Sequence, residues 1–329
     1  MLRARARHGA IPGVPEGHVM AWEQFGVSLP APPPSSSSSR MSAEISEIGG
    51  RLVMNAGGAR LEINRSTGLI ESYASAKGHL IGGGAPMFWR APTDNDKGVG
   101  TARMSERWRQ ASLERRVVSV SLDDRQIVIL FEVGDGLARF ETRYRLMSDG
   151  ALAVEGTFLP LLTDGPGPLR IGLSFSSSRD LSEFAWYGRG PLETYSDRKT
   201  GQAVGLWRMK VEELHHDYVQ PQETGARQEV RWFSLSGESG KGLSMKARRP
   251  VSVNVLAFPY GDLEASERSS QILPGREGSL LIDAVQAGVG GDDGWSPLGQ
   301  PHEAFRIPLR ELRYGFELVP RALPEAGSP

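Results

Sequence analysis

The sequence has no cysteine in its 329 residues. Without thiols the chain can form no disulfide, no thiolate nucleophile and no cysteine-ligated metal site, which fits a reducing compartment. It also lacks an apolar run long enough to span a bilayer, and no apolar segment follows the arginines of residues 1–7 as a secretory signal would require. We therefore expect a soluble, cytoplasmic protein with no membrane partner.

An excess of charge of one sign is also absent. The 38 lysines and arginines nearly cancel the 39 aspartates and glutamates, which leaves a net charge of −1. A chain this close to neutrality has no general attraction for nucleic acid or anionic lipid, so we expect its partner to be uncharged.

Helical periodicity is scarce as well. Only residues 101–113 place large apolar side chains, such as Met104 and Trp108, on one helical face. By contrast, Phe140–Leu146 alternates apolar and polar residues, and similar short strands recur along most of the chain, the last third included, for example at 263–267. This pattern predicts an all-β fold, a large antiparallel sandwich with one short helix.

Proline and serine divide the chain near its beginning. Residues 30–42 contain a polyproline stretch followed by serines, which predicts a linker. Before it, Val19–Phe25 has the composition of a strand but no evident partner, so we expect an unpaired edge there and a mobile stretch at residues 1–16. Residues 43–322 are predicted to form the sandwich domain and 323–329 a tail.

One large aromatic residue, Trp295, stands in the glycine- and aspartate-rich stretch Gly288–Pro297. This composition predicts a turn after the strand-like run Ser279–Gln286. A tryptophan beyond such a turn either grips a flat apolar partner, such as the C–H face of a sugar ring, or folds back over the sheet edge. Taken alone, the stretch favours the second arrangement.

A polar stretch begins at Phe88 and contains Asp94 and Asp96 on either side of an asparagine, as a calcium loop would. Met104, however, occupies the place of the glutamate that such a loop requires. The stretch therefore favours a polar turn, with Gly98 allowing the following segment to hinge.

Two more stretches are rich in polar residues. Residues 186–201 combine aromatic, glycine, arginine and acidic residues without periodicity, which predicts a long structured loop with a surface ion network. His215 and His216 precede Glu223, but neighbouring residues on a strand point to opposite faces, which disfavours a shared metal. No nucleophile elbow, P-loop or zinc-protease helix is present, so we expect no catalytic residue and no metal site on this chain.

Taken in order, these four stretches closely resemble the C-terminal region of the family-two β-galactosidases, which some bacteria encode as a separate small subunit. The resemblance covers roughly residues 45–320, and residues 1–29 look like the end of the immunoglobulin-like domain that precedes this region. Such a start is expected of a chain cut from a longer enzyme. The matching motifs are Phe88–Asp96, Tyr187–Pro191 with Asp197 and Arg198, Pro221–Gly225, where the family often has Glu-Asn-Gly, and Gly290–Trp295.

The resemblance implies an antiparallel super-sandwich similar to galactose mutarotase, docked beside a catalytic β/α barrel. Both catalytic glutamates of these retaining enzymes belong to the barrel, as do the magnesium and most sodium ligands. We therefore expect no cofactor on this chain, and a barrel-containing large chain or a missing N-terminal portion as partner. Trp295 would stack against the galactoside, and Asn95, Asp96 and Gly98 would belong to a mobile loop at the mouth of the site, hinged at Gly98.

Two other functions are open at this point. The chain could be a stand-alone carbohydrate-binding module or an inactive remnant. It could also be an independent mutarotase-like enzyme, with His215 or His216 and Glu223 as acid and base.

Overall fold

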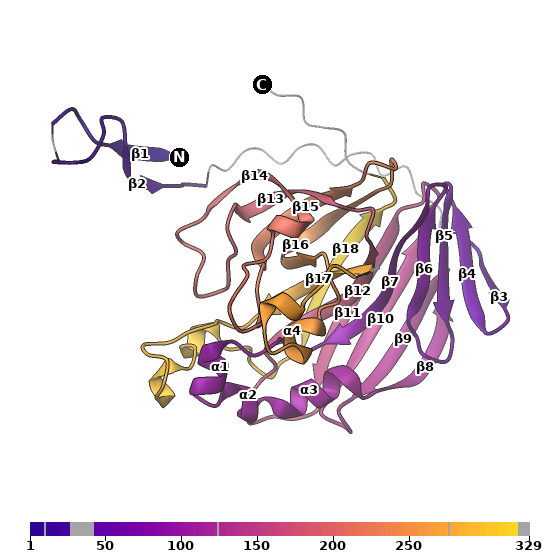
Figure 1. Ribbon diagram of the computed structural model, residues 1–329. Coiled ribbons are helices and arrows are strands. Elements are labelled where there is room, and N and C mark those ends of the chain that lie inside the picture. The colour runs from indigo at the N-terminus through magenta and orange to yellow at the C-terminus, as the bar shows by residue number, and fades with distance from the viewer. Residues whose placement is uncertain (10, 27–42, 124, 276, 322–329) are drawn as a thin grey trace. The chain divides into compact units, whose positions relative to one another are not determined.

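The computed structural model describes residues 1–9, 11–26, 43–123, 125–275 and 277–321 (Figure 1). These residues divide into two parts, Met1–Ser39 and Arg40–Pro329. The linker predicted at 30–42 and the tail predicted at 323–329 lie outside the described residues.

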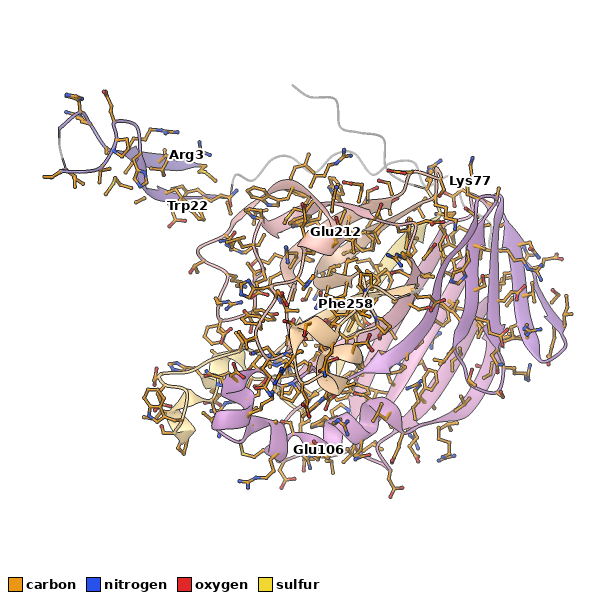
Figure 2. All side chains as sticks on the ribbon, viewed as in Figure 1. Arg3, Trp22, Lys77, Glu106, Glu212 and Phe258 are labelled. Atoms are coloured by element: carbon orange, nitrogen blue, oxygen red, sulfur yellow. The ribbon has the colours of Figure 1, made fainter. Side chains whose placement is uncertain are left out.

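The first part contains a two-stranded sheet. Strand β1 (Leu2–Arg5) pairs antiparallel with β2 (Val19–Glu23), and Arg3 lies opposite Trp22 (Figure 2). The prediction of an unpaired strand at Val19–Phe25 is therefore wrong, because β2 pairs with β1. It failed because β1 is only four residues long, too short for the alternation of Leu2 and Ala4 with arginines to stand out as a strand. The mobile stretch expected at residues 1–16 stays a prediction.

The second part is built on one antiparallel sheet that contains 16 strands in the described residues. This confirms the predicted all-β class. The strands are β3 (Ile45–Ile48), β4 (Arg51–Ala56), β5 (Ala59–Asn64), β6 (Ile70–Ser75), β7 (Gly78–Met87), β8 (Arg115–Asp123), β9 (Gln126–Val133), β10 (Ala138–Leu146), β11 (Leu152–Pro160), β12 (Arg170–Ser178), β13 (Glu183–Gly190), β14 (Ala203–Lys210), β15 (Arg227–Ser236), β16 (Gly242–Leu256), β17 (Glu277–Gln286) and β18 (Leu312–Val319).

The sheet has a main path and a branch. The main path runs β3-β4-β5-β6-β7-β12-β17-β16-β18-β11-β10-β9-β8. The branch leaves β16 through β15 and continues to β13 and β14. Consecutive strands at both ends of the path are joined by short turns, whereas the centre brings together strands far apart in sequence.

The main path curls until its two ends face each other, which closes the sandwich (Figure 1). The Tyr73 hydroxyl on β6 donates a hydrogen bond to the Gly150 carbonyl beside β11 at 2.7 Å. Gly68, in the turn before β6, lies so close to β9 that a methyl group there would be 2.8 Å from Ile129. Apolar side chains from both ends fill the space between them, among them Leu52, Leu61, Ile63, Phe131, Phe140 and Phe158.

The alternation predicted for Phe140–Leu146 is confirmed. On β10 the side chains of Phe140, Tyr144 and Leu146 are buried, while the arginines between them are more exposed. The sheet therefore presents one apolar face to the core and one polar face outward.

The helical segments differ from the prediction. The helix predicted at 101–113 is present as two pieces, α2 (Thr101–Met104) and α3 (Glu106–Leu113), which are separated at Ser105. The segment predicted as a polar turn contains α1 (Asp94–Gly98). Its start is set by a capping box in which Thr93 and Asp96 exchange side-chain to backbone hydrogen bonds.

Two further predictions of local structure are wrong. Residues 263–267, predicted as a strand, overlap α4 (Asp262–Ala265), where Leu263 packs into a small cluster with Phe258 and Tyr260. The stretch 186–201, predicted as one long loop, begins inside strand β13. In both places burial against neighbours overrides the weak local pattern.

Single turns of 3-10 helix complete the fold. They are η1 (Val211–Glu213), η2 (Ser269–Gln271), η3 (Pro297–Gly299) and η4 (Glu303–Phe305).

In the described ranges, the helices lack the length and apolar composition that crossing a bilayer requires.

Candidate functional site

Trp295 lies on a loop that follows β17, which we call the Trp295 loop (residues 287–300). Its side chain is 83% exposed, so the structure rejects the alternative in which the indole folds back over the sheet. The carboxylate of Asp293 accepts hydrogen bonds from the amides of Trp295 at 3.2 Å and Ser296 at 2.9 Å. The Ser296 hydroxyl also donates to this carboxylate, and it is the largest of the causes that hold the pKa of Asp293 below its ordinary value, followed by the Ser296 amide. The loop thus presents a bare indole on a fixed turn.

Hydrogen bonds also close the Trp295 loop between residues 292 and 298. The amide of Asp292 donates to the carbonyl of Leu298 at 2.8 Å, and His302 contacts the Asp292 carboxylate at 2.9 Å. Ser296 caps the 3-10 turn η3 by accepting from the amide of Leu298 at 3.2 Å. The backbone from 292 to 298 is therefore a closed unit rather than a free strand of chain.

Helix α1 packs directly against this unit (Figure 1). A methyl group at Gly98 would lie 2.4 Å from the Gly294 carbonyl oxygen, and one at Gly294 would lie 3.1 Å from the Asn95 side chain. The structure therefore brings together the Trp295 loop, Asn95 and Gly98, which the family resemblance assigned to one site. Glycine is needed at position 98 because it has no side chain to prevent this close approach. Its backbone conformation is helical and would itself accept other residues. Its role as a hinge stays a prediction.

Asp96 has a different place from the one expected at the mouth of a site. Its side chain is 2% exposed and accepts from Arg90 at 3.0 Å and 2.9 Å, and from the amide of Thr93 at 3.0 Å. With both oxygens occupied, Asp96 ties α1 to Arg90 and is closed to solvent. Within the described ranges, no three histidine, aspartate or glutamate side chains gather as a metal would require.

Arg90 and Asp197 contact the first four residues of the Trp295 loop, which we call the loop root (residues 287–290). Arg90 donates to the carbonyls of Ala287 at 2.8 Å and Gly288 at 2.7 Å. The Asp197 carboxylate accepts from the amides of the next two residues at 2.8 Å and 3.0 Å. In the sequence both residues stand only as members of motifs, and no spacing signal relates positions so far apart.

Glu223 belongs to a buried polar cluster beneath the site. Its carboxylate accepts from Gln286 at 2.9 Å, from Asn254 at 3.2 Å and from the Tyr260 hydroxyl, and it pairs with Arg170 at 3.5 Å. Burial, with the nearby Glu223 charge, raises the pKa of Tyr260 well above its ordinary value, so this hydroxyl stays a donor.

This cluster contradicts the idea of an independent mutarotase-like enzyme. The Glu223 side chain is fully buried, and its oxygens are occupied by neighbours, so it cannot reach a sugar as a base. His216 packs against Tyr218, and burial lowers the pKa of His215, which packs against Phe258. The histidines and Glu223 serve the fold in these positions.

The four polar motifs are linked to one another through these side chains. Gln222 exchanges two hydrogen bonds with Asp94, each of 3.0 Å, which ties the 221–225 motif to α1. Glu193 accepts from the amide of Gly225 at 2.8 Å and from Tyr218 at 2.7 Å, which ties the 186–201 stretch to the same motif. Motifs spread over some 200 residues of sequence therefore build one connected support for the Trp295 loop.

Solved structures with a similar fold include a galactose mutarotase related enzyme from Lactobacillus acidophilus. It is 12% identical, with a TM-score of 0.43, over 84% of this chain and 98% of that one. A putative aldose 1-epimerase from Escherichia coli is 13% identical, with a TM-score of 0.41, over 83% of this chain and 99% of that one.

Sequence comparison is more specific. A β-galactosidase of Priestia megaterium is 31% identical over 291 residues, covering 87% of this chain and 28% of that protein. Beta-galactosidase 2 of Enterobacter cloacae is 30% identical over 329 residues, covering 93% of this chain and 30% of that protein. The chain thus spans less than a third of the length of these relatives. The family model described as beta galactosidase small chain matches residues 55–318, and the chain belongs to this family.

Proposed function

We propose that this chain completes the substrate pocket of a β-galactosidase that hydrolyses terminal β-D-galactosides. The relatives that carry this name are more than three times as long, so most of such an enzyme lies outside the matched region. The observation that carries the proposal is the exposure of Trp295. Its side chain is 83% exposed, although its loop is held by the hydrogen bond between Asp292 and Leu298 and by the bonds of Asp197 to the loop root. An exposed indole on a fixed loop is suited to contact a ligand or a partner.

In this proposal the chain contributes binding and exclusion of water. The Trp295 indole packs against the C–H face of the galactosyl or leaving-group sugar and so covers one side of it. Hydrolysis with retention uses two carboxylates, one as nucleophile and one as acid and base. We assign both to a barrel domain supplied by a large chain or by a longer form of this polypeptide.

We assign the metals of the enzyme to the same missing portion. Magnesium requires several oxygen ligands converging on one point, and the described residues contain no group of three histidine, aspartate or glutamate side chains that could hold a metal. The cytoplasm is the proposed location, because the chain lacks the cysteines that an oxidising compartment often uses to stabilise proteins.

The role of Trp295 is tested in enzyme reconstituted from this chain and a barrel-containing partner. Trp295→Ala is expected to weaken transition-state binding by about 1–3 kcal/mol, a drop of roughly 5- to 150-fold in kcat/KM for o-nitrophenyl galactoside. Val219→Ala is the matched control, since Val219 is 90% exposed and lies on another loop. Unchanged KM and kcat in Trp295→Ala would remove Trp295 from the pocket.

The need for a partner is tested with the purified chain. Alone it is expected to show no hydrolysis of o-nitrophenyl galactoside, and activity is expected only after the partner is added. Hydrolysis by the chain alone would contradict our assignment of both carboxylates to the partner. Tight galactoside binding by the chain alone would instead favour a stand-alone carbohydrate-binding module.

A further inference from the structure

The loop root is held from two sides by side chains that come from different motifs. Arg90 binds two successive carbonyl groups, and Asp197 binds the two amide groups that follow them. Three successive peptide groups, from the Ala287 carbonyl to the Gly290 amide, are thus fixed immediately before the closed unit that presents Trp295. Because the indole is almost fully exposed, packing of its own ring contributes little to where it points.

The side chain of Arg90 and the backbone around Asp197 are each held by contacts other than those to the loop root. Arg90 is fully buried, and two of its nitrogens are bound by Asp96. Asp197 stands in a tight turn in which Tyr195 and Arg198 exchange backbone hydrogen bonds of 3.0 Å and 3.1 Å. The Arg198 guanidinium also lies 5.2 Å from the centre of the Tyr195 ring. The Arg90 guanidinium is therefore held in place independently of the loop root, and Asp197 extends from an ordered turn.

The backbone of the loop root packs closely against Asp197 and Phe305. A methyl group at Gly288 would lie 2.5 Å from the Asp197 carboxylate oxygen and 3.0 Å from Phe305. Only glycine therefore lets the backbone approach the carboxylate closely enough for one oxygen to accept two amide bonds. Hydrogen bonds to an ionised carboxylate are about twice as strong as those between neutral groups.

We propose that Asp197 is a positioning residue for Trp295, acting through the amides of Val289 and Gly290. It touches no substrate itself. Loss of its carboxylate frees one side of the loop root, and the closed unit then turns about the carbonyls that Arg90 still holds. The kinetic part of this inference rests on the proposed function of Trp295, whereas the structural part does not.

The structural part is tested by distance measurement between spin labels, which this cysteine-free chain makes simple. Labels are placed at Leu298→Cys, on the loop and 65% exposed, and at Val118→Cys on strand β8. Asp197→Ala is expected to broaden the distance distribution at least twofold. Asp180→Ala, which removes an exposed carboxylate paired with Lys241 elsewhere, is the control and should leave it unchanged. Equal distributions in all three proteins would overturn the proposal.

The kinetic part is tested in the reconstituted enzyme. Asp197→Ala is expected to lower kcat/KM about tenfold, as misplacing a binding group does, and to add nothing when combined with Trp295→Ala. Asp197→Asn keeps an oxygen that can accept both amide bonds and is expected to retain most of the activity. Full additivity of the two alanine changes, or equal loss in the asparagine and alanine variants, would overturn the positioning role.

The two proposals fail in different ways. If the label distances broaden in Asp197→Ala but Trp295→Ala leaves the kinetics unchanged, the support of the loop stands and the pocket role of Trp295 falls. If Trp295→Ala is impaired while Asp197→Ala matches the parent enzyme in kinetics, the positioning role falls and the pocket role stands.

Discussion

Glu193 illustrates how a single carboxylate joins two motifs of this site. Burial by itself would raise its pKa, but the bond from the Gly225 amide, together with Tyr218 and Arg198, outweighs burial and holds the pKa below the ordinary value. A group whose pKa is lower in the folded state stabilises the fold when ionised. This stabilisation is fully present above the unfolded pKa and is lost as pH falls through the folded one.

We therefore expect the effect of Glu193→Gln to depend on pH. At pH 7 the variant should lose about 1–3 kcal/mol of unfolding free energy, the scale for hydrogen bonds to a charged group. The difference from the parent chain should shrink as pH falls below about 4, where Glu193 becomes protonated in the unfolded state and then in the folded state. Urea unfolding at a series of pH values measures it.

The control for this series is Glu311→Gln, which removes an exposed partner of Arg313. Its cost is expected to stay under about 1 kcal/mol, as for other surface ion pairs. A cost for Glu193→Gln that stays constant from pH 7 to pH 3 would contradict the role given to its charge.

At the scale of elements, α1 and the Trp295 loop are in close contact at the candidate site. Gly98→Ala would place a methyl group 2.4 Å from the Gly294 carbonyl oxygen, although alanine otherwise favours a helix. We expect a loss of about 1–3 kcal/mol in stability from this overpacking. In the reconstituted enzyme we also expect reduced kcat/KM, because the Trp295 loop must move away.

Gly201→Ala is the matched control, since open space surrounds that glycine. Thermal unfolding and galactoside hydrolysis are measured for both variants. Parent-like stability and activity in Gly98→Ala would show that α1 and the loop separate easily, as a hinged, mobile segment would.

Elements also show what the sequence could predict and why. The strict alternation in Phe140–Leu146 predicted a strand correctly, because one face is apolar along its whole length. The capping pair Thr93 and Asp96 was present in the sequence but was interpreted as a polar turn. Helix α1 is too short to show a periodic apolar face, so only its cap could have revealed it.

The candidate site was predicted in part for similar reasons. Trp295 stood out because glycines and aspartates around a single indole leave it no core to fill, and its exposure agrees with this. Asp197 and Arg90 could not be assigned their roles, since they contact residues 92 and 198 positions away. Contacts of this range depend on the strand order, which local patterns do not determine.

At the scale of the whole molecule, the closure of the sandwich depends on contacts between the two ends of the sheet. The Tyr73 hydroxyl is buried and donates to the carbonyls of Gly150 at 2.7 Å and Leu318 at 3.2 Å. Tyr73→Phe leaves both carbonyls without this donor and is expected to cost about 1–2 kcal/mol of unfolding free energy.

Tyr187→Phe serves as the comparison, because Tyr187 is 40% exposed on the outer branch. Urea unfolding of both variants measures the difference. Equal stability of the two would mean that the closure draws nothing from this hydroxyl.

Strand β16 is the neighbour of three strands, because it pairs with β15, β17 and β18 along its 15 residues. The turn that carries Asp197 follows β13, which reaches the rest of the sheet through β15, while the Trp295 loop follows β17. The position of the Asp197 turn relative to the Trp295 loop therefore depends on the register of β16 with β15 and with β17. Inserting one residue into β16 would reverse its faces and shift one side against the other. During evolution, changes of chain length can accumulate in the outer turns of this sandwich, whereas β16 must keep its residue count.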